Sequence, residues 1–356
     1  MRFALSILLS ICSLFGFAQK KEVWIDSKFK AGFLASHRAI MGHLPAQHAF
    51  AGELSYHIQT KGEDSWNYSH KYPSYGGTLF FGSVGNNELL GYYLGTYAYV
   101  QLPIIRKKFY TFSFKSGAGL GYGTKVYDAE SNSLSMAIST HLNAQVVLGV
   151  ESRFKFDDHA ATMALDMTHF SNGASKVPNL GLNVPYVSMG YAYRIQESTF
   201  CDSCAIAGLG YKSWEIGLVG FGSFKEIFPV NGKKYAIAGL NMTARRYFNR
   251  RSGMEISLDV HTNQALMDYK PEISKTQWEL VQMGVFTGYL VPFGRLHLIV
   301  GMGTYFKDRL KQDGLFYHRV GTRYIFDNGI NMGVTLKSHW ARADFIEYGV
   351  GYMFKR

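Results

Sequence analysis

Two side chains that could act as a nucleophile and its base lie two residues apart near the middle of the chain. They are His169 and Ser171. A serine hydroxyl is a poor nucleophile until a neighbouring base removes its proton, and histidine can serve as that base. The pair therefore indicates a serine esterase, although a His-x-Ser spacing alone also occurs by chance.

The residues before this pair alternate between apolar and polar side chains. Met163, Leu165 and Met167 share the parity of the pair, whereas the residues between them are small or polar. Because alternate side chains of a β-strand point to the same face, the pair ends an apolar face. In a membrane-spanning barrel such a face contacts lipid, which places the pair where a lipid substrate could reach it.

A third polar residue opens the next predicted strand. Asn183 shares the parity of the apolar positions of that strand, which are Val187, Met189, Tyr191 and Tyr193. Its carbonyl could therefore accept the imidazole N–H of the base, as the asparagine of Cys-His-Asn proteases does. In the connection, Asn172, Gly173 and Asn179 could donate N–H groups to an oxyanion, and one such donor is worth about 3 kcal/mol of barrier.

The segment His-Phe-Ser-Asn at 169–172, followed by Pro-Asn-Leu-Gly at 178–181, resembles the motif of the lipid A 3-O-deacylases of the PagL type. The resemblance covers the first half of the chain and is strongest over 159–194. It implies an outer-membrane barrel of about eight strands that hydrolyses the ester-linked acyl chain at the 3 position of lipid A. The expected partners are the membrane and the lipopolysaccharide of its outer leaflet.

The same resemblance implies a role for each residue of the motif. Ser171 would be the nucleophile, His169 the base, and Asn179 a member of the oxyanion hole. The chain departs from the family at Asn183, where the family carries a glutamate. This difference puts the third member of the triad in question.

Two other readings remain open on the same residues. The segment 169–173 reads His-x-Ser-Asn-Gly and is also similar to outer-membrane phospholipase A, whose third member is an asparagine. That reading would add calcium dependence and a homodimer, whereas the deacylase reading needs no cofactor or metal. The segment 178–181 favours the deacylase. A structural or adhesion barrel without enzymatic activity is the third reading.

The start and the composition of the chain indicate an exported β-barrel. Arg2, an apolar run over 5–17 and small residues before position 19 predict a signal peptide at 1–18. The 356 residues include 38 Gly, 24 Tyr and 26 Phe, and no later segment is an unbroken apolar span. The net charge of +11 fits basic loops or attraction to lipid phosphates, and nucleic acid is not expected for an exported barrel.

Alternating segments divide the chain into two similar halves. The segment 109–123 is the clearest, with large apolar side chains on one parity and small residues on the other. The small inward face favours two narrow barrels of about eight strands over one barrel of about sixteen. We expect a catalytic barrel at 19–195, a linker at 196–210 and a second, degenerate barrel at 211–356. The predicted strands are 29–36, 47–59, 74–84, 89–101, 109–123, 136–154, 159–171 and 183–194, then 211–224, 233–248, 253–264, 276–290, 294–307, 315–326, 328–340 and 343–354.

The order of the strands places the pair relative to the membrane. If the chain starts on the periplasmic side, odd strands ascend and the connections after even strands are short. The seventh strand then carries His169 and Ser171 to the outer leaflet. The connection at 60–72 is too long for this rule, and the sequence does not explain its length.

The remaining histidines and cysteines have structural interpretations. His339 matches His169 in the proposed duplication, but Ala341 replaces the serine and Arg342 or a neighbour replaces Asn183, so we expect a structural residue there. The linker cysteines Cys201 and Cys204 favour a local disulfide. The histidines of the first surface loop, at positions 37, 43 and 48, are expected to be solvated.

Overall fold

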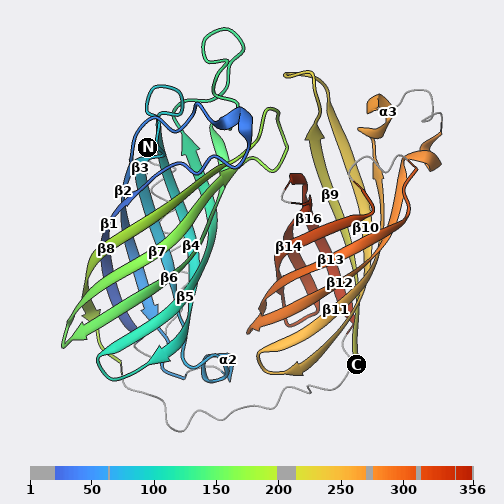
Figure 1. Cartoon of the computed structure of the whole chain (residues 1–356). Helices are drawn as coiled ribbons and strands as arrows, with labels where there is room; N and C mark the ends of the chain where they lie inside the picture. The colour runs from blue at the N-terminus through green and yellow to red at the C-terminus, as the bar shows by residue number, and fades with distance from the viewer. Residues whose placement is uncertain are drawn as a thin grey trace, which may run out of the picture.

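The computed structural model describes residues 21–62, 65–198, 214–269, 276–309, 314–340 and 342–354. Its strands form two closed antiparallel barrels that follow one another along the chain (Figure 1). This arrangement confirms the prediction of two eight-stranded barrels and excludes a single barrel of sixteen strands. The expected signal peptide and both linker cysteines lie outside the described residues.

The first barrel closes through pairing of its first and last strands. It also contains a short 3₁₀ helix, η1 (Ala39–Met41), and the helix α2 (Ser65–Ser69). Its strands are β1 (Glu22–Gly32), β2 (Ala49–Gln59), β3 (Ser74–Ser83), β4 (Tyr92–Arg106), β5 (Tyr110–Gly123), β6 (Leu142–Phe156), β7 (His159–Ser171) and β8 (Leu182–Gln196).

The second barrel closes by pairing of β16 with β9. The helix α3 (Leu266–Tyr269) and the 3₁₀ helix η2 (Gln277–Leu280) lie in one connection. None of the helices in the described part of the chain is long and apolar enough to cross a membrane. The strands are β9 (Trp214–Glu226), β10 (Lys234–Asn249), β11 (Ser252–Asn263), β12 (Val281–Phe293), β13 (Leu296–Lys307), β14 (Phe316–Ile325), β15 (Ile330–His339) and β16 (Arg342–Phe354).

The largest difference between predicted and observed strand ends occurs where charged residues that face the lumen give a strand the polar sequence of a loop. The first strand begins at Glu22 instead of position 29, because Asp26, Lys28 and Lys30 face the lumen and alternate with outward residues. The predicted strands at 136–154 and 276–290 also begin too early. Residues 136–141 belong to a connection, and Val281 follows η2.

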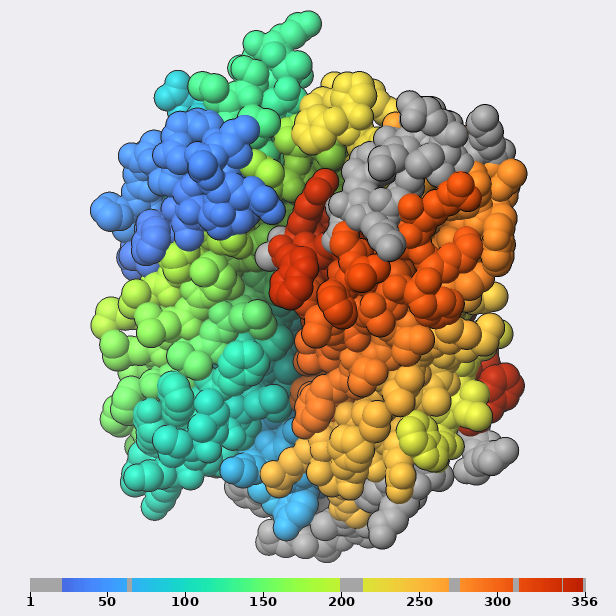
Figure 2. Space-filling model, turned by 45° about the vertical axis from the view of Figure 1, so that its right-hand side comes forward, coloured from blue at the N-terminus to red at the C-terminus, as the bar shows by residue number. Residues whose placement is uncertain are grey.

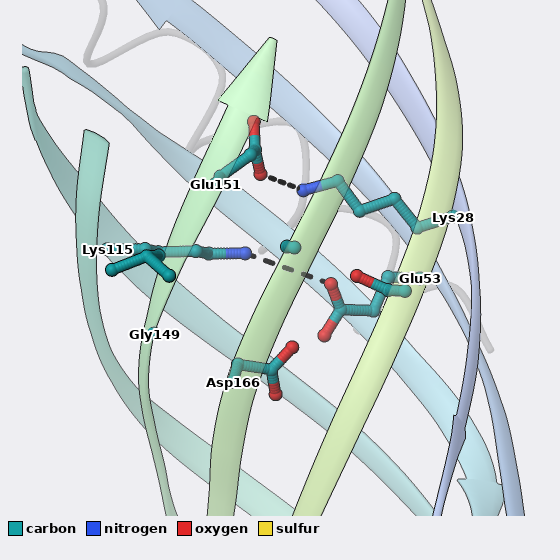
Figure 3. A pocket seen from close by; sticks show the side chains of 9 residues that line it. Lys28, Glu53, Lys115, Gly149, Glu151 and Asp166 are labelled. Atoms are coloured by element: carbon teal, nitrogen blue, oxygen red, sulfur yellow. Dashed lines mark hydrogen bonds and ion pairs between the residues drawn. The ribbon is translucent and has the colours of Figure 1, made fainter. Parts of the chain in front are cut away.

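Paired charged side chains occupy the lumen of the first barrel. Lys30 Nζ lies 2.9 Å from Glu53 Oε1 and 2.8 Å from Asp166 Oδ1. Figure 3 shows Lys115 reaching toward Glu53, at 3.7 Å, around a small pocket. Buried charges are costly unless they are paired, so these ion pairs allow a narrow polar lumen. Asp166 thus faces inward, and its charged partner is Lys30.

Apolar side chains close the end of the first barrel at which β7 ends. Phe170, Tyr93 and Tyr186 point inward and are buried. They pack with Leu34 and Ile138, which come from the long connections at that end. This cluster packs the ends of β7 and β8 against the loops. The other faces of both strands therefore point away from the lumen, toward the outside of the barrel.

The connections of the first barrel are long at one end and mostly short at the other. The long ones are 33–48, 84–91, 124–141 and 172–181, and two short ones are 107–109 and 157–158. Since outer-membrane barrels have their longer loops on the extracellular side, β7 ends toward the outer leaflet. This matches the orientation expected from strand counting.

The long connection at 60–73 contacts the second barrel. His70 Nε2 lies 2.8 Å from the carbonyl oxygen of Pro292, and the ring of Trp66 packs edge-on against Phe293 at 6.1 Å. Burial lowers the pKa of His70, as expected if this contact excludes water. The helix α2 lies at the lower end of the barrels in Figure 1, beside the turn between β12 and β13. Contact with the second barrel therefore gives this connection a structural role.

A charge on the outward face of β7 should destabilise the first barrel according to its depth. Leu165 is 57% exposed at the middle of the strand, so Leu165→Arg should lower the free energy of unfolding by about 2–4 kcal/mol. Phe156→Arg, at the end of β6, should cost about 0–1 kcal/mol because the charge can reach the interface. Urea unfolding of protein refolded into phospholipid vesicles measures both. Equal losses would contradict the orientation of β7.

Candidate active site

The end of β7 holds the predicted nucleophile and base on its outward face. Phe170, between them in sequence, is fully buried, and its ring lies 4.6 Å from Tyr93 and 5.9 Å from Phe80. His169 and Ser171 are each partly exposed on the other side of the strand. The inward phenylalanine therefore determines which way both polar side chains point.

The neighbouring strand brings the third predicted residue beside the imidazole. His169 is the cross-strand partner of Asn183. The distance between His169 Nδ1 and Asn183 Oδ1 is 2.6 Å, which is a short hydrogen bond. In this arrangement the imidazole donates from Nδ1, so its Nε2 has a free lone pair with which to accept a proton.

Hydrogen-bond donors from the connection after β7 surround the serine oxygen. Asn179 Nδ2 donates to Ser171 Oγ at 2.9 Å, and the N–H of Gly173 donates to it at 3.2 Å. The N–H of Asn172 lies 3.2 Å from Asn179 Oδ1. Because that N–H can only donate, it fixes the amide of Asn179 with its nitrogen toward Ser171.

The side chain of Asn172 points away from the serine. It is buried, and its Nδ2 donates to Ser139 Oγ at 3.2 Å and to the carbonyl oxygen of Lys176 at 2.9 Å. These bonds tie the start of the connection to the preceding surface loop. Only the backbone of Asn172 therefore contributes to the surroundings of Ser171.

The imidazole of His169 occupies space that is free because Gly181 has no side chain, and it is not hydrogen-bonded to Ser171. Among the described residues, no hydrogen bond joins Ser171 to His169, and the hydroxyl also lies 3.3 Å from Asn179 Oδ1. Gly181 has a φ of +77°, and a Cβ on it would lie 2.8 Å from His169 Cε1. Catalytic hydrogen bonds in unliganded enzymes are often long and shorten when substrate binds.

The structure adds one residue that the sequence analysis did not place in the site. His37 Nδ1 lies 3.1 Å from Asn183 Nδ2, and His37 Nε2 lies 3.0 Å from the carbonyl oxygen of Leu180. His37 is exposed, as expected for a solvated loop residue, but both of its ring nitrogens also have protein partners. Closure of the predicted barrel could have indicated this position, because β1 pairs with β8 and the chain after β1 continues beside Asn183.

A second histidine of the first surface loop does not extend the site. His43 Nε2 lies 2.9 Å from the carbonyl oxygen of Leu134. Within the described ranges, no group of three or more His, Cys, Asp or Glu residues is arranged to hold a metal ion. That the reaction needs no cofactor stays a prediction.

The histidine expected to match His169 in the second barrel faces the opposite way. His339 is buried in the lumen, with Nδ1 2.9 Å from the carbonyl oxygen of Phe316 and Nε2 3.4 Å from Asp344 Oδ2. Ala341 lies outside the described residues, and Arg342 begins β16 with its side chain exposed. His339 therefore has the contacts of a structural residue.

The second barrel contacts the connection that carries the predicted oxyanion donors. The two barrels lie side by side (Figure 2). A Cβ on Gly173 would lie 2.4 Å from Ile346 Cδ1, so the side chain of Ile346 packs directly on this glycine. The N–H of Glu226 donates to the carbonyl oxygen of Ala174 at 3.2 Å. The conformation of the connection thus depends partly on residues of the second barrel.

Adding a methyl group at Gly181 should displace the base and leave the fold intact. Gly181→Ala should slow the reaction of Ser171 with an alkyl fluorophosphonate by about 100-fold, which is the lower end of what a general base contributes. Mass spectrometry of the modified peptide gives the rate. Gly314→Ala is the matched control, since Gly314 also has a positive φ, +89°, and nothing lies within 4 Å of a Cβ at that position. An unchanged rate in Gly181→Ala would contradict the role of His169.

Comparison with solved structures returns other membrane barrels, but with poor superposition. A mutant porin of Rh. blastica is 10% identical over 94% of this chain and 100% of that chain, with a TM-score of 0.19. The β domain of the Bordetella autotransporter BrkA is 8% identical over 95% of this chain and 100% of that chain, with a TM-score of 0.25. No curated protein matches the chain.

Two family models match the chain, and they correspond to the two barrels. The model described as lipid A 3-O-deacylase (PagL) matches residues 50–192. The model described as acyloxyacyl hydrolase, C-terminal domain, matches residues 213–356. The first match confirms the resemblance seen in the motif, and the second assigns the other barrel to a domain of the same family. The chain therefore belongs to the PagL family of lipid A 3-O-deacylases and is a protein of the cell outer membrane.

Proposed function

We propose that the protein is a serine esterase that removes an ester-linked acyl chain from lipid A. The observation that carries the proposal is the position of Ser171 and His169. Both side chains lie on the lipid-facing side of β7, beside Asn183, at the end of the barrel with the long connections. An acyl chain of the outer leaflet could reach Ser171 there without entering the lumen.

In the proposed reaction, His169 moves one proton in each direction. Ser171 Oγ attacks the ester carbonyl carbon while His169 Nε2 takes the hydroxyl proton. The tetrahedral intermediate then expels the sugar-side oxygen, which receives that proton and leaves an acyl-serine. Water attacks the acyl-serine in the same way and releases the free fatty acid, which restores the serine.

Two donors beside Ser171 support a site for the negative charge of the intermediate. That charge develops on the former carbonyl oxygen, which is attached to the carbon that bonds to Ser171 Oγ, so donors within hydrogen-bond distance of Oγ lie close to it. Asn179 Nδ2 and the N–H of Gly173 satisfy this condition. Each such donor typically lowers the barrier by about 3 kcal/mol.

Asn183 orients the base but stabilises it less than a carboxylate. Its carbonyl accepts from His169 Nδ1 and so selects the tautomer with a free Nε2. When His169 takes the proton, a neutral amide offers less attraction to the imidazolium than an acidic residue would. We therefore expect a functional triad whose rate would increase with aspartate at this position.

The outer leaflet and the charge of the chain favour lipid A as the substrate. The net charge is +11, and the loops that flank the site contain Arg38 and Lys176. Positive charge at the membrane surface attracts anionic lipid phosphates. Lipid A carries phosphates together with ester-linked acyl chains, and so it meets both requirements.

Removal of the serine hydroxyl should abolish trimming of lipid A. In a Gram-negative host that lacks such an enzyme, the intact protein should lower the mass of lipid A by one hydroxyacyl chain. Ser171→Ala should reduce this conversion by at least about 10³-fold. Ser152→Ala is the matched control, because Ser152 also faces outward, on β6, and its hydroxyl lies 3.2 Å from that of Tyr110. Trimmed lipid A in the Ser171→Ala strain would refute the assignment.

The asparagine at position 183 also favours the second candidate, a phospholipase. The two functions differ in product and in metal dependence. We expect purified protein to deacylate lipid A at the same rate with and without a calcium chelator, since the proposed reaction uses only protein groups. Release of fatty acid from phospholipid that stops on chelation would support the phospholipase instead. If neither lipid is cleaved, the barrel has a structural or adhesion role.

A further inference from the structure

We infer that His37 is a positioning residue that fixes the orientation of the Asn183 amide. The inference rests on the proposed function, because it concerns the base of the same reaction. His37 does not contact Ser171 in this structure, so it acts through its neighbour. Its two ring nitrogens instead bond to Asn183 and to the backbone of Leu180.

An asparagine in this position has a difficulty that a carboxylate does not have. Either oxygen of a carboxylate can accept the imidazole N–H, whereas an amide presents an acceptor on one side and a donor on the other. If Asn183 turned its nitrogen toward His169, the imidazole would have to accept at Nδ1. Its proton would then sit on Nε2, and the ring could no longer take the proton of Ser171.

The chain of hydrogen bonds that runs from Leu180 through His37 and Asn183 to His169 allows only one orientation of the Asn183 amide. The carbonyl oxygen of Leu180 can only accept, so His37 Nε2, at 3.0 Å, carries the proton. A neutral His37 then has a lone pair on Nδ1, which accepts from Asn183 Nδ2 at 3.1 Å.

The remaining steps lead to the base. With its nitrogen bonded to His37, Asn183 turns Oδ1 toward His169 and accepts from Nδ1 at 2.6 Å. The lone pair of His169 Nε2 is thereby left free. A single backbone carbonyl therefore sets the tautomer of the catalytic histidine through two intervening side chains.

Barrel closure places His37 at this point. The chain after β1 continues along β8, and the N–H of Ala35 donates to the carbonyl oxygen of Asn183 at 2.8 Å. His37 follows two residues later, and its side chain is exposed. Because burial does not hold the ring, its two hydrogen bonds must account for its position.

A double-mutant cycle between His37 and Asn183 tests the inference. The readout is the rate at which Ser171 reacts with an alkyl fluorophosphonate, together with kcat and KM for lipid A. His37→Ala should lower the rate and kcat by about tenfold, with little change in KM, which is the loss expected for one hydrogen bond. In the background of Asn183→Asp, the same change should cost less than about twofold, because a carboxylate needs no orientation.

Several outcomes would overturn the inference. An equal loss in both backgrounds would show that His37 acts through folding or substrate binding, and no loss in the natural background would show that it has no role. His37→Gln keeps an acceptor, whereas His37→Leu has none, so equal rates for these two variants would also contradict it. Labelling of Ser171 needs no lipid A, so the labelling rates test the role of His37 even if the proposed substrate is wrong.

Discussion

The site depends on the side-chain alternation of β7, which Phe170 fixes. Its ring is fully buried among Tyr93 and Phe80, so the residues before and after it must face the membrane. A shift of one residue would exchange the two faces of the strand and turn both polar side chains into the lumen. The hydrogen bond from His169 to Asn183 requires the same alternation on β8, because the two residues are cross-strand partners.

Sequence patterns predicted the parts of the protein that depend on local alternation. The two barrels, the outward face of β7 and the pairing of His169 with Asn183 all follow from side-chain parity. The start of β1 could not be found in this way, because its charged side chains are stabilised by partners on distant strands, such as Glu53 and Asp166 for Lys30. The contribution of His37 was missed for the same reason, since it depends on a loop that meets β8 only after the barrel closes.

The second barrel repeats the architecture of the first without repeating the site. His339 faces the lumen, where its neighbours are Asp344 and a backbone carbonyl. The two barrels instead meet at both ends, through Ile346 on Gly173 and through Trp66 on Phe293. The first of these contacts lies beside the donors that surround Ser171, so the second barrel supports the connection on which the proposed oxyanion site depends.

The measurement that tests the account most directly is the environment of position 171. A fluorophore on Ser171→Cys, in protein reconstituted into lipid nanodiscs, should be quenched strongly by lipids brominated near the headgroup end of their acyl chains. Aqueous iodide and deeply brominated lipids should quench it weakly. Strong quenching by iodide with none by brominated lipid would place the side chain in an aqueous lumen. Such a result would contradict a nucleophile that meets its substrate in the outer leaflet.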